Sequence, residues 1–189
     1  MVDSANATRS APLFYVSPNQ INFVVPDSAT NGTATVKVTD SSDSSTSTVT
    51  VAVVSPGVFT ANGNGVGVAA AIAIRRIIAS QMDTQVPVYQ CNANGCSSIG
   101  ITMGPDAQVF LELFGTGIRG RASLGDVKAT IGGENVDVLF AGAQGAFPGL
   151  DQVNLSLPQT LHAEGETDVI LTVDGQAANK VRVNLHHGQ

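Results

Sequence analysis

The sequence predicts an all-β fold, built from immunoglobulin-like β-sandwich modules in tandem with the first module shortened. Three observations support this fold class: polar and apolar residues alternate, turn-forming residues separate the alternating stretches, and part of the pattern occurs twice. Short strands separated by turns at intervals of about eight to twelve residues are typical of a β-sandwich.

Alternation along the chain marks the individual strands, each with one face expected in a core. The stretch 69–79 is rich in Ala, but its isoleucines are β-branched, so we predict a strand there rather than a helix. Turn signals such as Asp174-Gly175 lie between the alternating stretches. The clearest predicted strands cover residues 35–39, 48–53, 127–131 and 181–185.

An internal repeat divides the chain into two modules. Residues 20–26 (QINFVVP) match residues 152–158 (QVNLSLP), and much more sequence precedes the second copy than the first. We therefore place the modules at residues 1–55 and 56–189, and expect the first to lack its opening strands. Its uncovered strand edges predict edge pairing, as in a homodimer. Upstream, Leu13-Phe14 matches Leu139-Phe140 if the second copy carries a short insertion near residues 144–149. Downstream, the matched residues are Gly32, Val36, Val38 and Thr39 with Gly165, Val169, Leu171 and Thr172, and Val49, Val51 and Val53 with Val181, Val183 and Leu185.

Composition narrows the classes of function. The 189 residues carry nine Lys and Arg against fifteen Asp and Glu, for a formal net charge of -6. Nucleic-acid binding is not expected, because neutralising phosphates requires clustered basic residues. No apolar run reaches the roughly 18 residues that a membrane-spanning helix needs. Three His and two Cys exclude cofactor sites that use many such ligands.

Cys91 and Cys96 flank an Asn-Gly turn signal, so a hairpin would bring them within disulfide reach. A zinc site would need two further ligands nearby, and the sequence offers none. A disulfide suits an extracellular or cell-surface location. Residues 1–6 have neither the basic start nor the apolar segment of a signal peptide, so we expect the signal upstream of this fragment.

Five motifs of the chain form a recognisable set: APLFYVSPNQINFVVP at 11–26, SPGVFTANG at 55–63, LFGTGIR at 113–119, AGAQ at 141–144 and FPGLDQVN at 147–154. They resemble the uncharacterised C-terminal domain family abundant in Solibacter and other Acidobacteria. The resemblance covers nearly the whole chain and implies tandem immunoglobulin-like modules at the end of large secreted or surface proteins. It implies no activity, and both the cysteine hairpin and the short first module depart from the family pattern.

Candidate chemistry rests on few residues. His162 is the only His away from the end of the chain, and Glu164 and Asp168 follow it closely. If the chain is an enzyme, these residues would be the base and its orienting carboxylate in a hydrolase of esters or lactones.

Loop carboxylates offer a second kind of site. We expect no required cofactor, but Ca²⁺ takes oxygen ligands and is the metal that such loops would favour. The candidate ligands are Asp40, Asp43, Asp151 and Glu166.

The function that the sequence favours is a non-catalytic extracellular interaction or spacer module of a larger secreted or cell-surface bacterial protein. Its partners would be other domains of the parent protein or a surface partner. One alternative is the Ca²⁺-assisted hydrolase of esters or lactones. The other is a glycan-binding adhesion module that uses Tyr15 or Tyr89, although the chain has no Trp for stacking on sugars.

Overall fold

The computed structural model describes residues 1–187, and the chain divides into an N-terminal unit, Met1–Val53, and a C-terminal unit, Val54–Gln189. The predicted all-β class is confirmed, since the helical structure of the described residues is a single 3₁₀ turn, η1 (Leu124–Asp126). Within residues 1–187, no helix combines the length and apolar character needed to cross a membrane.

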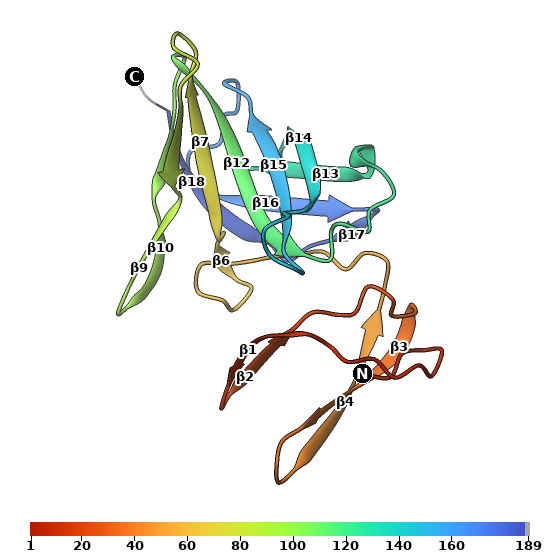
Figure 1. Ribbon diagram of the computed structural model, residues 1–189. Coiled ribbons are helices and arrows are strands. Elements are labelled where there is room, and N and C mark those ends of the chain that lie inside the picture. The colour runs from red at the N-terminus through yellow and green to blue at the C-terminus, as the bar shows by residue number, and fades with distance from the viewer. Residues whose placement is uncertain (188–189) are drawn as a thin grey trace. The chain divides into compact units, whose positions relative to one another are not determined.

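The N-terminal unit consists of two antiparallel hairpins, each a separate two-stranded sheet (Figure 1). Alternating apolar residues and short turns favour the hairpin form at both places. The first hairpin pairs β1 (Leu13–Ser17) with β2 (Gln20–Phe23), and the second pairs β3 (Gly32–Thr39) with β4 (Ser44–Val51).

The C-terminal unit contains one curled, 12-stranded sheet and a small disulfide-bonded hairpin. Its strands are β5 (Gly57–Val58), β6 (Gly67–Val68), β7 (Ala71–Ile77), β8 (Asp83–Pro87), β9 (Tyr89–Asn92), β10 (Gly95–Ser98), β11 (Gly100–Met103), β12 (Ala107–Thr116), β13 (Val127–Ile131), β14 (Glu134–Ala143), β15 (Asp151–Leu157), β16 (Gly165–Val173), β17 (Gln176–Ala177) and β18 (Val181–His187).

Strand β14 joins the two halves of the curled sheet. It pairs with β13 on one side and with β15 on the other, so the order runs β11-β18-β16-β13-β14-β15-β12-β7-β8. In Figure 1, β7, β12 and β15 run side by side, and β13, β16 and β18 cross behind them. Leu111 and Leu155 from one half and Leu171 and Val183 from the other are buried in a common core.

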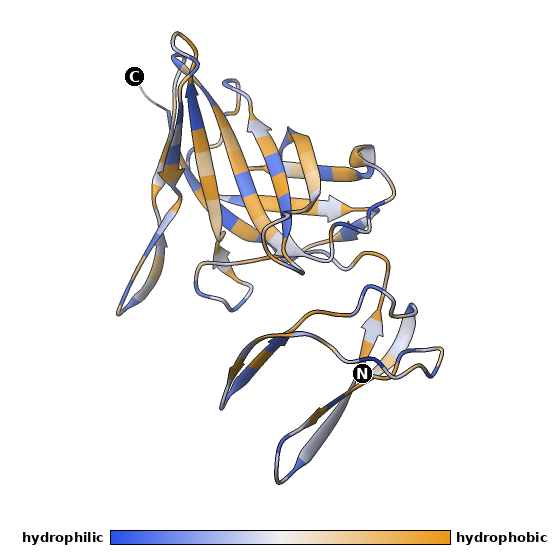
Figure 2. Cartoon of the chain, viewed as in Figure 1, coloured by the Kyte–Doolittle hydropathy of each residue, from blue (hydrophilic) through white to orange (hydrophobic). Residues whose placement is uncertain are grey.

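The alternation read from the sequence explains why this core forms. Successive side chains of a strand point to opposite faces, so alternate apolar residues line one face. On β15 the buried residues are Asp151, Val153, Leu155 and Leu157, with half-buried polar residues between them. Figure 2 shows the same alternation of hydrophobic and hydrophilic positions along β12 and β15. The predicted strand in 69–79 is also present, as β7.

The two units share details of strand pairing. Leu13 faces Phe23 and Tyr15 faces Asn22, with an irregularity at the residue between them. The β14–β15 pair has the same irregularity, because Val138 faces Leu155 and Phe140 faces Asn154. In both units a Gln also donates to the Asn two residues later, Gln20 to Asn22 and Gln152 to Asn154, at 2.7 Å.

The strand pairing in the structure differs in two places from the expected alignment of the two sequence copies. Gly32 faces Val51 on β4, while Gly165 faces Leu185 on β18. Val51 therefore corresponds to Leu185, two residues further along than the sequence match placed it. At the other hairpin, Leu13 corresponds to Val138, one residue earlier than expected. The shift of two residues keeps every side chain of the strand on the same face.

Candidate functional site

Apolar residues that should face a core are open to solvent in the N-terminal unit. Among its residues, all of which the structure describes, Ala34 is the one hydrophobic side chain that is fully buried. Other apolar residues of this unit lie at positions whose counterparts in the C-terminal unit face its core. We call the surfaces that these residues form the open faces. They comprise Leu13, Val16, Ile21, Phe23 and Val25 on the β1–β2 side and Val36, Val38, Val49 and Val51 on the β3–β4 side.

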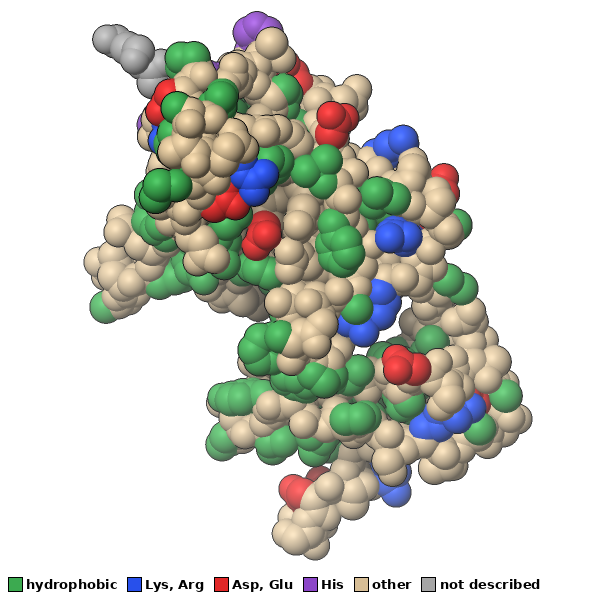
Figure 3. All heavy atoms as spheres, turned by 45° about the horizontal axis from the view of Figure 1, so that its top comes forward, with side chains coloured by type: hydrophobic (Ala, Val, Ile, Leu, Met, Phe, Trp, Pro, Cys, Tyr) green, Lys and Arg blue, Asp and Glu red, His purple; other side chains and the backbone are tan. Residues whose placement is uncertain are grey.

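Corresponding positions in the two units differ sharply in exposure. Phe23 is 36% exposed whereas Leu155 is fully buried, and Val38 is 41% exposed whereas Leu171 is 1% exposed. Figure 3 shows hydrophobic side chains gathered on the surface of the N-terminal unit. The same contrast separates the exposed Val16, Val25 and Val49 from the buried Ala141, Leu157 and Val183.

The difference arises from strands that the C-terminal unit has and the N-terminal unit lacks. Strand β12 pairs with β15, and β13 pairs with both β14 and β16. Their buried side chains, among them Leu111 and Ile131, belong to the core that covers the inner faces of β15 and β16. Within residues 1–53, β2 pairs only with β1, and β3 pairs with β4 and a single residue of the N-terminal segment.

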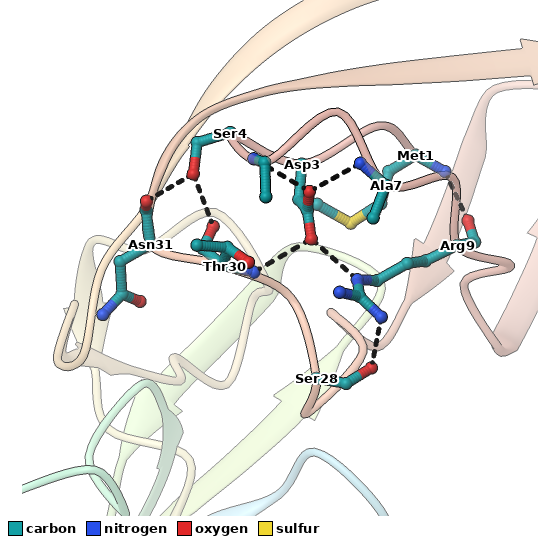
Figure 4. Close-up of polar contacts among 9 residues, drawn as sticks. Met1, Asp3, Ser4, Ala7, Arg9, Ser28, Thr30 and Asn31 are labelled. Carbon is teal, nitrogen blue, oxygen red and sulfur yellow. Dashed lines mark hydrogen bonds and ion pairs between the residues drawn. The ribbon is translucent and has the colours of Figure 1, made fainter.

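Asp3 fixes that N-terminal segment in place (Figure 4). Its carboxylate accepts hydrogen bonds from the backbone N–H groups of Ala5, Ala7 and Thr30 and from Arg9 Nε, at 2.8–3.1 Å. These bonds, led by the one from Arg9, hold the pKa of Asp3 well below its ordinary value. The anchored segment places Val2 against β3, where Val2 and Thr35 exchange two backbone hydrogen bonds of 2.8 Å.

The predicted hydrolase residues have other partners. The backbone N–H of His162 donates to Glu134 Oε1 at 2.8 Å, and its Nδ1 lies 3.3 Å from Glu134 Oε2. These contacts, the backbone bond first, lower the pKa of Glu134. Asp168 accepts a hydrogen bond from Lys180, and Glu164 is exposed. Glu134 was not among the sequence candidates, because 28 residues separate it from His162.

The four predicted Ca²⁺ ligands serve as hydrogen-bond acceptors, Asp40 and Asp43 in one loop and Asp151 and Glu166 each at another place. Asp40 closes its own loop by accepting from the N–H groups of Ser42 and Asp43, and Asp43 accepts from Ser44. Within residues 1–187, no three His, Cys, Asp or Glu side chains are grouped so that they could hold a metal ion.

Asp151, another of these candidates, is completely buried and holds the turn after β12. Its Oδ2 accepts from the backbone N–H groups of Ile118 and Arg119 at 2.7 and 3.1 Å, and its Oδ1 accepts from Arg119 Nε at 2.6 Å. The sequence did not indicate this structural role, because the turn follows β12 whereas Asp151 begins β15, far along the chain.

A recess of about 250 Å³ lies beside the disulfide-bonded β9–β10 hairpin. The predicted Cys91–Cys96 disulfide is present there, and Cys96 is among the lining residues. Glu166, the fourth Ca²⁺ candidate, pairs across the recess with Arg182 at 3.3 Å and accepts from Ser98 at 2.7 Å. The charges of this recess are thus matched within the protein.

The two tyrosines considered for glycan binding lie in different units. Tyr15 is 52% exposed on β1, whereas Tyr89 is half-buried and packs against the core of the C-terminal unit. They do not form a shared stacking platform within one unit.

Comparison of the chain with family models, curated proteins and solved structures finds no match. The choice of a candidate functional site therefore rests on geometry alone. By that criterion the site is the open faces of the N-terminal unit.

Proposed function

We propose that the chain is a non-catalytic interaction module of a larger secreted or cell-surface bacterial protein, with the open faces of its N-terminal unit as the binding surface. The observation that carries this proposal is the exposure of Phe23 and Val38 at positions whose counterparts are buried. Exposed apolar surface on a folded unit marks sites of protein association.

Shared strand pairing supports the further proposal that the two units are tandem versions of one immunoglobulin-like module. The C-terminal unit would be a complete sandwich, and the N-terminal unit would correspond to its β14–β15 and β16–β18 parts. The extracellular location rests on the Cys91–Cys96 disulfide, because disulfides persist in oxidising compartments.

Binding of the apolar dye bis-ANS tests the proposed surface. The full chain should bind the dye with enhanced fluorescence, and Phe23→Asp combined with Val38→Asp should remove most of that signal. Leu139→Asp is the matched control, because Leu139 is an exposed apolar residue of the C-terminal unit. Equal loss of signal in the control and in the double variant would count against the open faces as the binding surface.

A panel of chromogenic esters and lactones, with Ca²⁺ and again with EDTA, tests the non-catalytic part of the proposal. We expect no turnover above buffer in either condition. Turnover that disappears in His162→Ala would instead assign hydrolase activity to the chain.

A further inference from the structure

We propose that the N-terminal unit binds two β-strand segments of one partner polypeptide. One segment adds to the free edge of β3, and together the two cover the open faces with alternate apolar side chains. The inference rests on the proposed interaction function and names the chemistry of the partner. The mode of binding is strand addition, in which main-chain hydrogen bonds give affinity and alternate side chains give specificity.

The free edge of β3 begins where the Val2 contact ends. Thr35 directs both its backbone N–H and its C=O toward Val2. Because residues with outward-pointing groups alternate along an antiparallel strand, Lys37 and Thr39 direct theirs to the same side. Within residues 1–53 no strand pairs with that edge beyond Val2.

The C-terminal unit shows what such an edge accommodates. Asp168 corresponds to Thr35, and its C=O accepts a hydrogen bond of 2.9 Å from Gly132, the residue directly after β13. Beyond that point Ile170 faces Thr130 and Thr172 faces Lys128 along β13. Val2 therefore corresponds to Gly132, the residue directly after β13. An antiparallel strand that occupied the place of β13 in the N-terminal unit would lie against Lys37 and Thr39.

The inner faces set the chemistry of the incoming segment. On β13 the residues opposite Leu171 and Val169 are Ala129 and Ile131, both buried. On β12 Leu111 and Leu113 face Leu155 and Val153 in the same way. Because Val38, Val36, Phe23 and Ile21 take these places in the N-terminal unit, the partner needs two short strands with apolar residues at every second position.

A second copy of this chain is a poorer occupant. Its own segments of that kind, β12 and β13, are already buried in its core. Antiparallel pairing of two β3 edges would bring the two Lys37 side chains close together, and like charges on neighbouring strands are destabilising. The occupant that fits is a strand pair from a different polypeptide.

The probe for the test is a fluorescein-labelled peptide of residues 106–133, which contains the β12 and β13 sequences of this chain. Added to the full chain, it should show saturable binding by fluorescence anisotropy. Lys37→Pro removes the edge N–H donor and should weaken binding by about tenfold or more. Thr48→Pro is the matched control, because Thr48 faces Thr35 and directs its N–H away from β3 on the opposite edge of the same hairpin.

A variant with all edge N–H groups intact guards against a folding artefact. Val38→Asp places a charge on the open face and should also weaken binding about tenfold or more. In hydrogen exchange, the peptide should slow the amides of Lys37 and Thr39 and leave that of Thr48 unchanged.

Absence of saturable binding would overturn the proposal, as would equal affinity for Lys37→Pro and Thr48→Pro. A concentration-dependent dimer that dissociates in Lys37→Pro alone would make a second copy the occupant and overturn the partner named here. The bis-ANS experiment does not involve the peptide, so failure of strand addition is distinguishable from failure of the proposed binding surface.

Discussion

At the scale of single residues, two carboxylates hold chain segments that carry no regular structure. Asp3 ties the N-terminal segment to the loop before β3, and Asp151 holds the turn after β12. Each accepts several N–H groups, including the Nε of an Arg. Such charge-assisted bonds stabilise the native state most where the donors would otherwise be buried without a partner.

Asp151→Ala should lower the free energy of unfolding of the C-terminal unit by about 3 kcal/mol, because the buried N–H of Ile118 loses its acceptor. Asp151→Asn keeps an acceptor oxygen and should cost less. Urea unfolding followed by circular dichroism measures both effects. The exposed Asp137→Ala is the control and should stay within about 0.5 kcal/mol of the parent; an equally small effect at Asp151 would contradict the role given to it.

Acid should weaken the N-terminal unit through protonation of Asp3. Since the folded pKa of Asp3 lies below its unfolded value of about 3.9, its stabilising effect is present above that pH and is lost as the pH falls toward the folded pKa. We expect the unfolding midpoint of this unit to fall progressively as the pH drops below about 5, and Asp3→Asn to reduce that slope.

Asp40 shares the direction of its pKa shift with Asp3, because the N–H groups of Ser42 and Asp43 bond to its carboxylate. Asp40→Asn therefore separates the two contributions. NMR chemical shifts of Thr30 and Ser42 report each site during the titration. A slope unchanged in Asp3→Asn and removed in Asp40→Asn would assign the acid response to the β3–β4 loop instead.

At the scale of strands and hairpins, sequence patterns predicted where the strands lie in the chain better than which residues face each other across them. Alternation located β3, β13 and β18, since burial of one face leaves a period of two in the sequence. The match of Val49 to Val181 missed the pairing by two residues, because a shift of two preserves that period. The contact of Glu134 with His162 was not predictable either, since no local pattern records which loops a sheet brings together.

The disulfide should act locally. Cys91 and Cys96 face each other on β9 and β10 and close a very short loop, so little unfolded-chain entropy is removed. Replacing both with Ser should cost about 2 kcal/mol or less and should speed amide exchange in the hairpin. Exchange in β12 and β15 should stay slow. Loss of protection throughout the C-terminal unit would show that the hairpin stabilises the whole core.

At the scale of the whole molecule, the two units differ in how much apolar surface they bury. The core of the C-terminal unit draws on residues from Val58 to Leu185, whereas the N-terminal unit fully buries Ala34 alone among its hydrophobic residues. Because apolar burial is the main favourable term in folding, the stabilities of the units should differ widely. The sequence predicted a repeat and a short first module, whereas the exposure of individual side chains could be described only from the strand pairing.

Urea should therefore unfold the chain in two steps, the N-terminal unit first. The chain has no Trp and one Tyr in each unit, so Tyr15 in a Tyr89→Phe variant and Tyr89 in a Tyr15→Phe variant follow the units separately by fluorescence. Coincident transitions would show that the units unfold together and would contradict the difference in burial.

Because a ligand stabilises only the state that binds it, the peptide of residues 106–133 at tenfold its Kd should shift the Tyr15 transition by about 1.4 kcal/mol and leave the Tyr89 transition in place.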